Sequence, residues 1–417
     1  MGASQFAGGR IAAMVILATC SLPAYATNGF NLIGFGAEST LMGGADVAVA
    51  RDPSALNTNP AGLAQIQGRM FNGFASLLRT TDLRHEDQLG NDEHASNRYT
   101  GLGGGGYAQS LDSLPCTAGV GMFAQGGAGG VFKNITTPAG NEDKFSALFG
   151  IAKFTGGIGC QVTDDLALGG SFGLVYASLE QNLYGNSTNG IKLEDVSAIR
   201  PTFKLGVQYK LTPRVVLAAS YTGKTELPMT DGEFRVNTQA LGVVTYHDAS
   251  FKGFALPREI AVGAAFRPND DWLLSVKLNW IEWSDALTTS TLRATNPDNP
   301  AAPDLTQTNT LDWKNQWVIA TGAAYTLNDR TTLYAGYNYG RNPIPRNNST
   351  PFIAGILEHH YTVGAAYKWN EEWTVTGGVE YDARIRVKYN NPDLSYFGDS
   401  AISNEAVFFH FMLTRKW

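Results

Sequence analysis

The chain has few charged residues and no long apolar run beyond its N-terminus. Charged residues make up 16% of the 417 residues, whereas about a quarter is usual in soluble proteins. Because no stretch of roughly 18 apolar residues follows the N-terminus, a bundle of membrane-spanning helices is excluded. The net charge of −6 gives no indication of nucleic-acid binding. Glycine (47 residues) and aromatic residues (11%) are abundant, which favours an all-β protein that faces lipid on one side.

The N-terminus has the three parts of a secretory signal peptide. Arg10 supplies the positive charge, residues 11–18 form the apolar core, and the sequence AYA at 24–26 provides the small residues of a cleavage site. We therefore expect residues 1–26 to be removed and the mature chain to begin at Thr27. The alternative is a lipoprotein, because LATC at 17–20 resembles a lipobox, although Thr19 fits that motif poorly.

Apolar and polar residues alternate strictly in the second half of the chain. Residues 272–280 read WLLSVKLNW, and residues 203–211 and 373–387 repeat this pattern. A period of two indicates β-strands. Such strands fit a soluble sandwich with the apolar face in its core, or a membrane barrel with that face toward lipid and the polar face toward a lumen.

Three features favour the membrane barrel. Aromatic residues such as Trp272 and Trp280 stand at strand ends, as in the girdles at membrane interfaces, and the polar face carries Lys, Arg and Glu at mid-strand. Short turns also alternate with long polar segments, as periplasmic turns alternate with outer loops. The turns lie at 112–116, 162–166, 211–214, 267–271, 327–330 and 369–372, and the long segments near 81–97, 126–144, 180–196, 223–257, 284–311, 341–358 and 389–403.

Six turns and seven loops join fourteen strands. An even number lets the barrel begin and end at the same rim, and closure removes every open strand edge. We therefore predict an all-β fold, a 14-stranded antiparallel transmembrane β-barrel over residues 67–417.

The segment that precedes the strands resembles a known family. NGFNLIGFGAESTLMGGADVAVARDPSALNTNPAGL, at 28–63, is similar to the mature N-terminus of the FadL-type outer-membrane transporters, and Asn59, Pro60 and Ala61 match the hatch motif of that family. Residues 256–284 and 338–345 match further along the chain. The family takes up long-chain fatty acids, and its relatives take up aromatic hydrocarbons such as toluene or xylene. The resemblance implies fourteen strands and a plug, or hatch, formed inside the barrel by residues 27–66.

The composition of residues 27–66 suits a plug. Gly34, Gly36, Gly43 and Gly44 let the backbone turn freely and pack closely. Prolines interrupt regular structure, although residues 39–50 are compatible with a short helix. The alternative, a disordered linker, fits poorly with so many Leu, Ile, Phe and Val residues.

The resemblance also implies a route for a hydrophobic substrate. Outer loops at 180–196 and 223–257 would capture it, and the second loop is rich in apolar residues; the predicted capture residues are Leu227, Met229, Phe234, Leu241, Phe251 and Phe254. The alternative is that these residues pack against neighbouring loops. A tighter site at the plug would follow, and release would be sideways through a gap made by a kink in the third strand.

The third strand corresponds to residues 116–130. The predicted positions of the kink are Gly126 and Gly127, with Gly119 and Gly121 as deeper alternatives, because glycines disturb a β-ladder. The other interpretation is that Gly126 and Gly127 simply begin an outer loop.

Charged and sulfur-containing residues give further hypotheses. Alternation turns Lys204, Lys277, Arg384 and Arg386 toward the lumen, where they would bind a fatty-acid carboxylate or pair with acids such as Glu380 and Asp382.

Cys116 and Cys160 fall at the periplasmic ends of neighbouring strands. Because the periplasm is oxidising, these cysteines form either a disulfide or two separate thiols.

The sequence gives little support to other functions. The five histidines of the predicted outer loops, His85, His94, His247, His359 and His360, lack compelling partner spacing, and the adjacent pair is a weak metal signal. We expect no enzyme activity, cofactor or metal. A polar porin and an adhesin remain rival functions. The expected location is the outer membrane of a Gram-negative bacterium, and the expected partners of this monomer are membrane lipids and a hydrophobic small molecule, either a long-chain fatty acid or a monoaromatic hydrocarbon.

Overall fold

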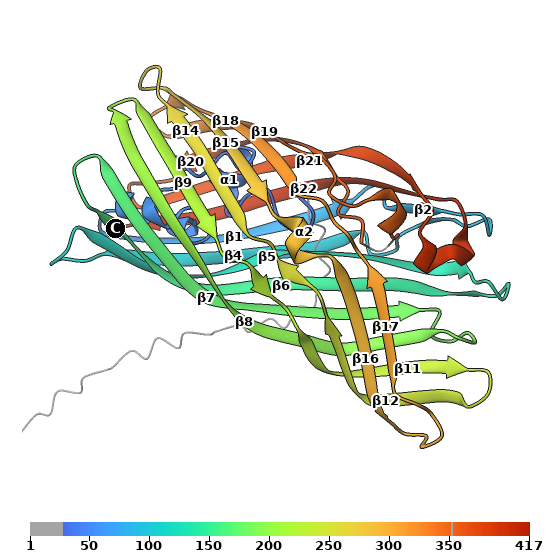
Figure 1. The fold of residues 1–417 in the computed structure, drawn as a ribbon. Coiled ribbons are helices and arrows are strands. Elements are labelled where there is room, and N and C mark those ends of the chain that lie inside the picture. Colours follow the sequence, from blue (N-terminus) through green and yellow to red (C-terminus); the bar gives the residue numbers. More distant parts are fainter. Residues whose placement is uncertain (1–27, 352) are drawn as a thin grey trace, which may run out of the picture.

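Residues 28–351 and 353–417, which the computed structural model describes, form a closed antiparallel β-barrel of tilted strands (Figure 1). Fourteen strands make the wall, as the sequence predicts, and the first pairs with the last to close it. The wall strands are β1 (Arg69–Thr80), β4 (Tyr99–Ser110), β5 (Cys116–Thr136), β6 (Glu142–Gln161), β7 (Leu166–Leu183), β8 (Ile191–Thr212), β9 (Val215–Thr222), β14 (Glu259–Phe266), β15 (Trp272–Ile281), β18 (Gln316–Asn328), β19 (Thr331–Gly340), β20 (His359–Lys368), β21 (Trp373–Tyr389) and β22 (Ser400–Lys416). The predicted signal peptide, residues 1–26, and Thr27 lie outside the described residues.

All six predicted short turns connect consecutive wall strands. Two of the predicted outer loops are wrong in extent, because residues 126–144 and 180–196 belong largely to long hairpins. The β5–β6 ladder reaches Thr136 and Glu142, and the β7–β8 ladder reaches Leu183 and Ile191. These hairpin ends project past the membrane, where no lipid requires an apolar face, so the alternation that reveals a strand is lost there.

Smaller strands extend the outer end of the barrel (Figure 1). A ribbon continues from β8 through four strands, which are β11 (Met229–Thr238), β12 (Gly242–Lys252), β16 (Thr289–Pro297) and β17 (Leu305–Thr310). The other short elements are β2 (Arg84–Glu86), β3 (Asp92–His94), β10 (Thr225–Glu226), β13 (Ala255–Leu256), α2 (Trp283–Ala286), η3 (Arg346–Asn348) and η4 (Pro392–Phe397). These elements build the walls of an outer chamber.

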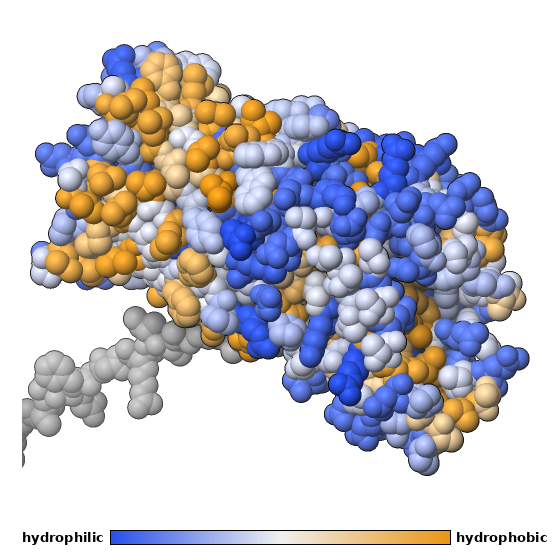
Figure 2. Space-filling view, in the orientation of Figure 1, coloured by the Kyte–Doolittle hydropathy of each residue, from blue (hydrophilic) through white to orange (hydrophobic). Residues whose placement is uncertain are grey.

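The wall follows the predicted alternation. In β15, Trp272, Leu274, Val276 and Leu278 point outward, whereas Ser275 is buried. Figure 2 shows hydrophobic side chains gathered over the half of the barrel that holds β9, β14 and β15, and hydrophilic ones over the half that holds β2. No helix among the described residues has the length and apolarity to cross a membrane.

Residues 28–66 lie inside the barrel and are almost entirely buried. They form α1 (Ala37–Leu41) and the 3₁₀ turns η1 (Pro53–Leu56) and η2 (Pro60–Gln65). α1 contacts β19 to β22, whereas η2 contacts β5 to β8, so the segment spans the lumen. Gly43 has a φ of +64°, and a Cβ there would lie 2.6 Å from the backbone nitrogen of Tyr337. Only glycine permits this approach to the wall.

A β-bulge in β21 makes the predicted inward orientation of Arg384 and Arg386 wrong. The ladder with β22 shifts register between Asp382 and Ile385, and an extra residue turns every later side chain to the opposite face. Ile385 therefore packs on the buried apolar cluster of the outer chamber. Arg384 and Arg386 do not face the lumen; they are about half exposed and pair with Asp82 and Glu86 of the β1–β4 connection.

Cys116 and Cys160 are paired in register on β5 and β6 and form a disulfide. The sequence left open a disulfide or two separate thiols, and the structure has the disulfide.

The outward face of β15 gives a test of the membrane assignment. Val276→Arg places a charge at mid-strand on the lipid face, and we expect it to lower the free energy of unfolding from lipid vesicles by about 2–4 kcal/mol. Leu327→Arg, an exposed position beside a periplasmic turn, should cost only about 0–1 kcal/mol. Equal costs at the two positions in urea titrations would contradict the assignment.

Candidate functional site

The outer chamber contains a cavity of about 770 Å³. Apolar atoms form the larger part of its surface, from side chains such as Leu183, Tyr184, Phe251, Phe254, Leu292 and Tyr396. Polar side chains, mostly Thr, Ser, Asn and Gln, line the rest. Burial raises the pKa of both Tyr184 and Tyr396, so neither phenol carries a charge. The cavity therefore suits an apolar molecule.

The predicted capture residues occupy three different environments. Phe251 and Phe254 line the outer cavity. Leu227, Met229 and Phe234 are buried in the cluster behind it, and Leu241 is exposed in the β11–β12 connection. Sequence reasoning missed Tyr184 and Tyr396, although aromatic residues inside polar segments are the signal that marks them.

An aromatic cluster closes the inner side of this cavity. Phe30, on the N-terminal segment, lies at its centre, with ring centroids 5.1 Å from Phe149, 5.8 Å from Phe254, 5.7 Å from Trp283 and 4.9 Å from Trp313. Phe254 also lines the outer cavity. The N-terminal segment thus places one side chain directly beneath the chamber.

A second, smaller cavity of about 70 Å³ is lined in part by residues close to Phe30 in sequence. Asn28 and Asn31, which flank Phe30 closely in sequence, contribute to its lining. Three lysines of the wall also line it, Lys153, Lys204 and Lys277. Asp46 and Glu259 line it as well, so the inner cavity is polar and contains charges of both signs.

The three lysines have different partners. Lys277 forms an ion pair of 2.9 Å with Asp46 of the N-terminal segment, and Lys153 donates a hydrogen bond of 2.9 Å to the Asn57 side chain. Lys204 is buried, and among the described residues it has neither a hydrogen-bond nor an ion-pair partner. The structure brings the predicted Lys204 and Lys277 to one cavity. Lys153 was missed, and a lone lysine in the otherwise apolar run 145–154 is the signal that marks it.

Asn59, Pro60 and Ala61 anchor the N-terminal segment to the wall. The Asn59 carboxamide oxygen accepts a hydrogen bond from the Ala61 backbone nitrogen and so caps η2, which begins with Pro60. Its amide nitrogen donates to the carbonyl oxygens of Val47 (2.8 Å) and Val207 (3.1 Å). One buried side chain thus ties together η2, the preceding turn and β8.

The wall is incompletely paired between β4 and β5. Their ladder ends at Gly104 and Phe123, although β5 continues to Thr136 along β6 with a bulge between Ala124 and Gly126. Beyond the bulge, the Gly127 nitrogen donates to the Phe30 carbonyl oxygen (3.1 Å). The glycines at 126 and 127 lie within β5, so the interpretation that they begin an outer loop is wrong.

The sequence of residues 23–407 matches the family described as outer membrane protein transport protein (OMPP1/FadL/TodX). The chain belongs to this family. It is accordingly an outer-membrane protein of a family of transporters of hydrophobic compounds, which is not an enzyme family.

Relatives of known structure share the fold of this FadL/TodX family member. The toluene transporter TodX of Pseudomonas putida has a TM-score of 0.76 at 21% identity, with 93% of this chain and 99% of that one covered. The toluene transporter TbuX of Ralstonia pickettii has a TM-score of 0.75 at 19% identity, and a Pseudomonas aeruginosa FadL homologue 0.73 at 16%, with the same coverage. Outer membrane protein P1 of Haemophilus influenzae is 25% identical over 206 residues, which cover 49% of this chain and only 42% of that protein.

The anchoring role of Asn59 in this family member can be tested. Asn59→Ala removes the η2 cap and two donated hydrogen bonds, so we expect the seating of the N-terminal segment to weaken by roughly 2–3 kcal/mol. Cleavage of the folded barrel by trypsin after Arg51 should therefore accelerate. Gln65→Ala, an exposed neighbour in η2 with one long contact of 3.5 Å, is the control. Unchanged cleavage of the Asn59 variant would contradict the anchoring role.

Proposed function

We propose that this protein takes up long-chain fatty acids across the outer membrane. The substrate is captured in the outer cavity, passes Phe30 to the inner cavity, and leaves sideways into the bilayer. The observation that supports a fatty acid is Lys204, a largely buried lysine that lines the inner cavity and forms neither a hydrogen bond nor an ion pair among the described residues.

A largely buried ammonium group without a direct partner is costly, because burial removes part of its hydration. Glu259 and Asp46 line the same cavity but form no ion pair with Lys204. Lys277 has an ion-pair partner and Lys153 a hydrogen-bond partner, so Lys204 is the lysine of this cavity with neither among the described residues. A carboxylate that binds Lys204 gains a charge-assisted hydrogen bond. A hydrocarbon gains nothing from this group, so Lys204 selects for substrates with an anionic head.

The two cavities suit successive steps. The outer one, about 770 Å³, falls in the range of small-molecule sites, whereas the inner one, about 70 Å³, is too small for a long alkyl chain. A substrate therefore has to displace Phe30 and its neighbours to enter. In this proposal residues 28–66 are a plug that moves in response to binding.

Sideways release is favoured over release through the periplasmic end. A cavity of about 620 Å³ at that end is lined by charged side chains, including Arg51, Lys210, Arg267 and Lys368. Such a lining is unfavourable for an alkyl chain. The end of the β4–β5 ladder at Gly104 and Phe123 instead provides an exit toward lipid.

A second candidate substrate is a monoaromatic hydrocarbon. Two of the relatives are described as toluene transporters. The aromatic rings around Phe30 would accept a flat ring by edge-to-face contacts. Both substrates would use the same route, and the difference between them lies in the role of Lys204.

The substrate class can be tested with Lys204→Met. We expect its Kd for oleate to rise at least about tenfold, because a hydrogen bond to a charged group contributes roughly 1.5–3 kcal/mol. Its Kd for oleyl alcohol should not change. Lys210→Met, on the same strand but exposed near the periplasmic turn, should bind both ligands as the wild type does.

Uptake of oleate and toluene is also measured in a deletion strain, alone and complemented with each variant. Loss of toluene uptake alone in the uncomplemented strain would favour the aromatic substrate. Equal weakening of oleate and oleyl alcohol binding by Lys204→Met would contradict recognition of the carboxylate.

The proposed exit can be tested at Gly126. A Cβ there would lie 1.8 Å from the Phe30 carbonyl oxygen, so Gly126→Ala has to break the contact between β5 and the N-terminal segment, at a cost of about 1–3 kcal/mol. We expect oleate uptake to fall while binding in the outer cavity persists. Gly140→Ala is a matched control, because Gly140 also has positive φ but no atom within 4 Å of the added Cβ. Normal uptake by the Gly126 variant would argue against this exit.

A further inference from the structure

Four titratable side chains meet on the inner face of three consecutive wall strands. His360 lies on β20, Glu380 and Asp382 on β21, and His410 on β22. His360 is directly opposite Asp382 in the β20–β21 ladder, and His410 is opposite Gly378, two residues before Glu380. The register therefore brings together residues that are up to 50 positions apart in the sequence.

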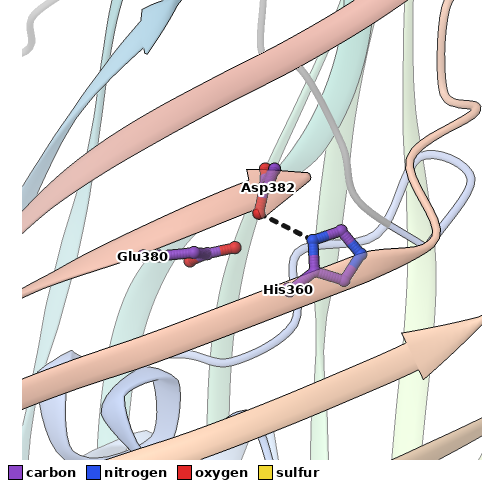
Figure 3. Close-up of side chains that lie close together, drawn as sticks. All are labelled: His360, Glu380 and Asp382. Carbon is purple, nitrogen blue, oxygen red and sulfur yellow. Dashed lines mark hydrogen bonds and ion pairs between the residues drawn. The ribbon is translucent and has the colours of Figure 1, made fainter. Parts of the chain in front are cut away.

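The side chains are close together and buried. The Asp382 Oδ1 and His360 Nδ1 atoms are 2.7 Å apart, and the Glu380 Oε2 and His410 Nε2 atoms are 3.0 Å apart. His360, Glu380 and Asp382 each provide one potential ligand atom, and these three atoms lie within 4.8 Å of one another. Figure 3 shows the His360 ring and the two carboxyl groups directed toward a common space.

The two carboxylates lack sufficient compensation. Among the described residues, neither Glu380 nor Asp382 pairs with a lysine or arginine; each forms an ion pair with a histidine, and the two carboxyl groups also interact with each other. The Glu380 Oε1 and Asp382 Oδ2 atoms are buried and have no hydrogen-bond partner within the described part of the chain. Two adjacent buried carboxyl groups with unsatisfied oxygens are unfavourable when both are ionised, and either protons or a bound cation compensate them.

A small cavity adjoins this cluster. Its volume of about 20 Å³ is enough for one water molecule. Glu380, His410 and Ser76 line it from the wall, and Gly34 and Thr40 line it from the N-terminal segment. A further ligand from solvent therefore has room beside Glu380.

We propose that His360, Glu380 and Asp382 bind a divalent transition-metal ion of the Zn²⁺ class inside the barrel. One imidazole with two carboxylates is a ligand set that zinc accepts, and a water molecule in the adjoining cavity supplies a fourth ligand. Ligand atoms around tetrahedral zinc are about 3.3 Å apart, as bonds of roughly 2.0–2.2 Å require. Small side-chain shifts from the present separations reach that geometry. The ion neutralises both carboxylates and satisfies their orphaned oxygens.

The sequence did not reveal this site, and no metal was expected from it. The adjacent pair His359 and His360 suggested a common ligand role, but a strand turns neighbouring residues to opposite faces. His359 is instead hydrogen-bonded to the Tyr337 hydroxyl at 2.8 Å. His360 points inward, where its partners come from β21.

The experiment uses the full-length barrel, stripped of metal with a chelator, and titrates Zn²⁺ by calorimetry with the bound metal counted by mass spectrometry. We expect one tightly bound Zn²⁺ per protein. Asp382→Asn keeps the shape of the side chain but removes its charge. It should weaken the affinity by about 10–100-fold, as loss of a ligand or its support does.

The matched control is Asp87→Asn. Asp87 and His85 form another pair with both side chains fully buried, but no third ligand joins them among the described residues. This variant should bind Zn²⁺ as tightly as the wild type. Circular dichroism confirms that each variant retains its barrel.

Two results would overturn the proposal. One is that the folded wild-type protein takes up no stoichiometric Zn²⁺. The other is that Asp382→Asn and the wild type bind the ion equally well, which would place any bound zinc elsewhere.

Discussion

The rest of the structure depends on the satisfaction of backbone hydrogen bonds inside a bilayer, where no water is present to replace them. A β-sheet meets this requirement only by closing on itself, as β1 does with β22. Closure with fourteen strands leaves a lumen, and side chains of the wall do not fill it. The N-terminal segment occupies that space, and its glycines let its backbone touch the backbone of the wall, as Gly43 touches Tyr337. A turn-rich segment without a sheet of its own therefore precedes the strands.

The same segment compensates for the break in the wall. Where β4 no longer pairs with β5, the backbone around Phe30 provides a partner for Gly127. The Phe30 side chain meanwhile supports the outer cavity through Phe254. A movement of these few residues therefore changes the floor of the outer cavity, the inner cavity and the edge of β5 together. In the proposed function, this coupling links substrate capture to release without a separate gate.

The sequence was informative wherever contact with lipid requires apolar and polar residues to alternate. Alternation and short turns were enough to predict the fourteen strands. Lys204 and Lys277, which alternation turns inward, both line the inner cavity. Outside the bilayer both faces of a strand meet protein or water, so the outer parts of β5 to β8 had no periodic signal. The orientation of Arg384 and Arg386 was predicted wrongly because a bulge adds one residue to the strand. The residue types alone give no sign of such a bulge. The lining of the outer cavity was equally hidden, because Tyr184, Phe254 and Tyr396 converge from three distant segments.

Charges on the inner face of the wall follow one principle, that each requires a counter-charge brought by another segment. Asp46 provides it for Lys277, which also fixes the N-terminal segment to β15. Lys204 has no ion-pair partner among the described residues, although Glu259 and Asp46 line the same cavity. Glu380 and Asp382 pair with histidines, which compensate ionised carboxylates only when protonated. Buried charges of this kind persist when a ligand completes them, since replacement by apolar residues would otherwise stabilise the fold. The two imbalances are of opposite sign and lie on different strands, β8 and β21, so they do not neutralise each other. In the two proposals, an anion completes the first site and a cation completes the second.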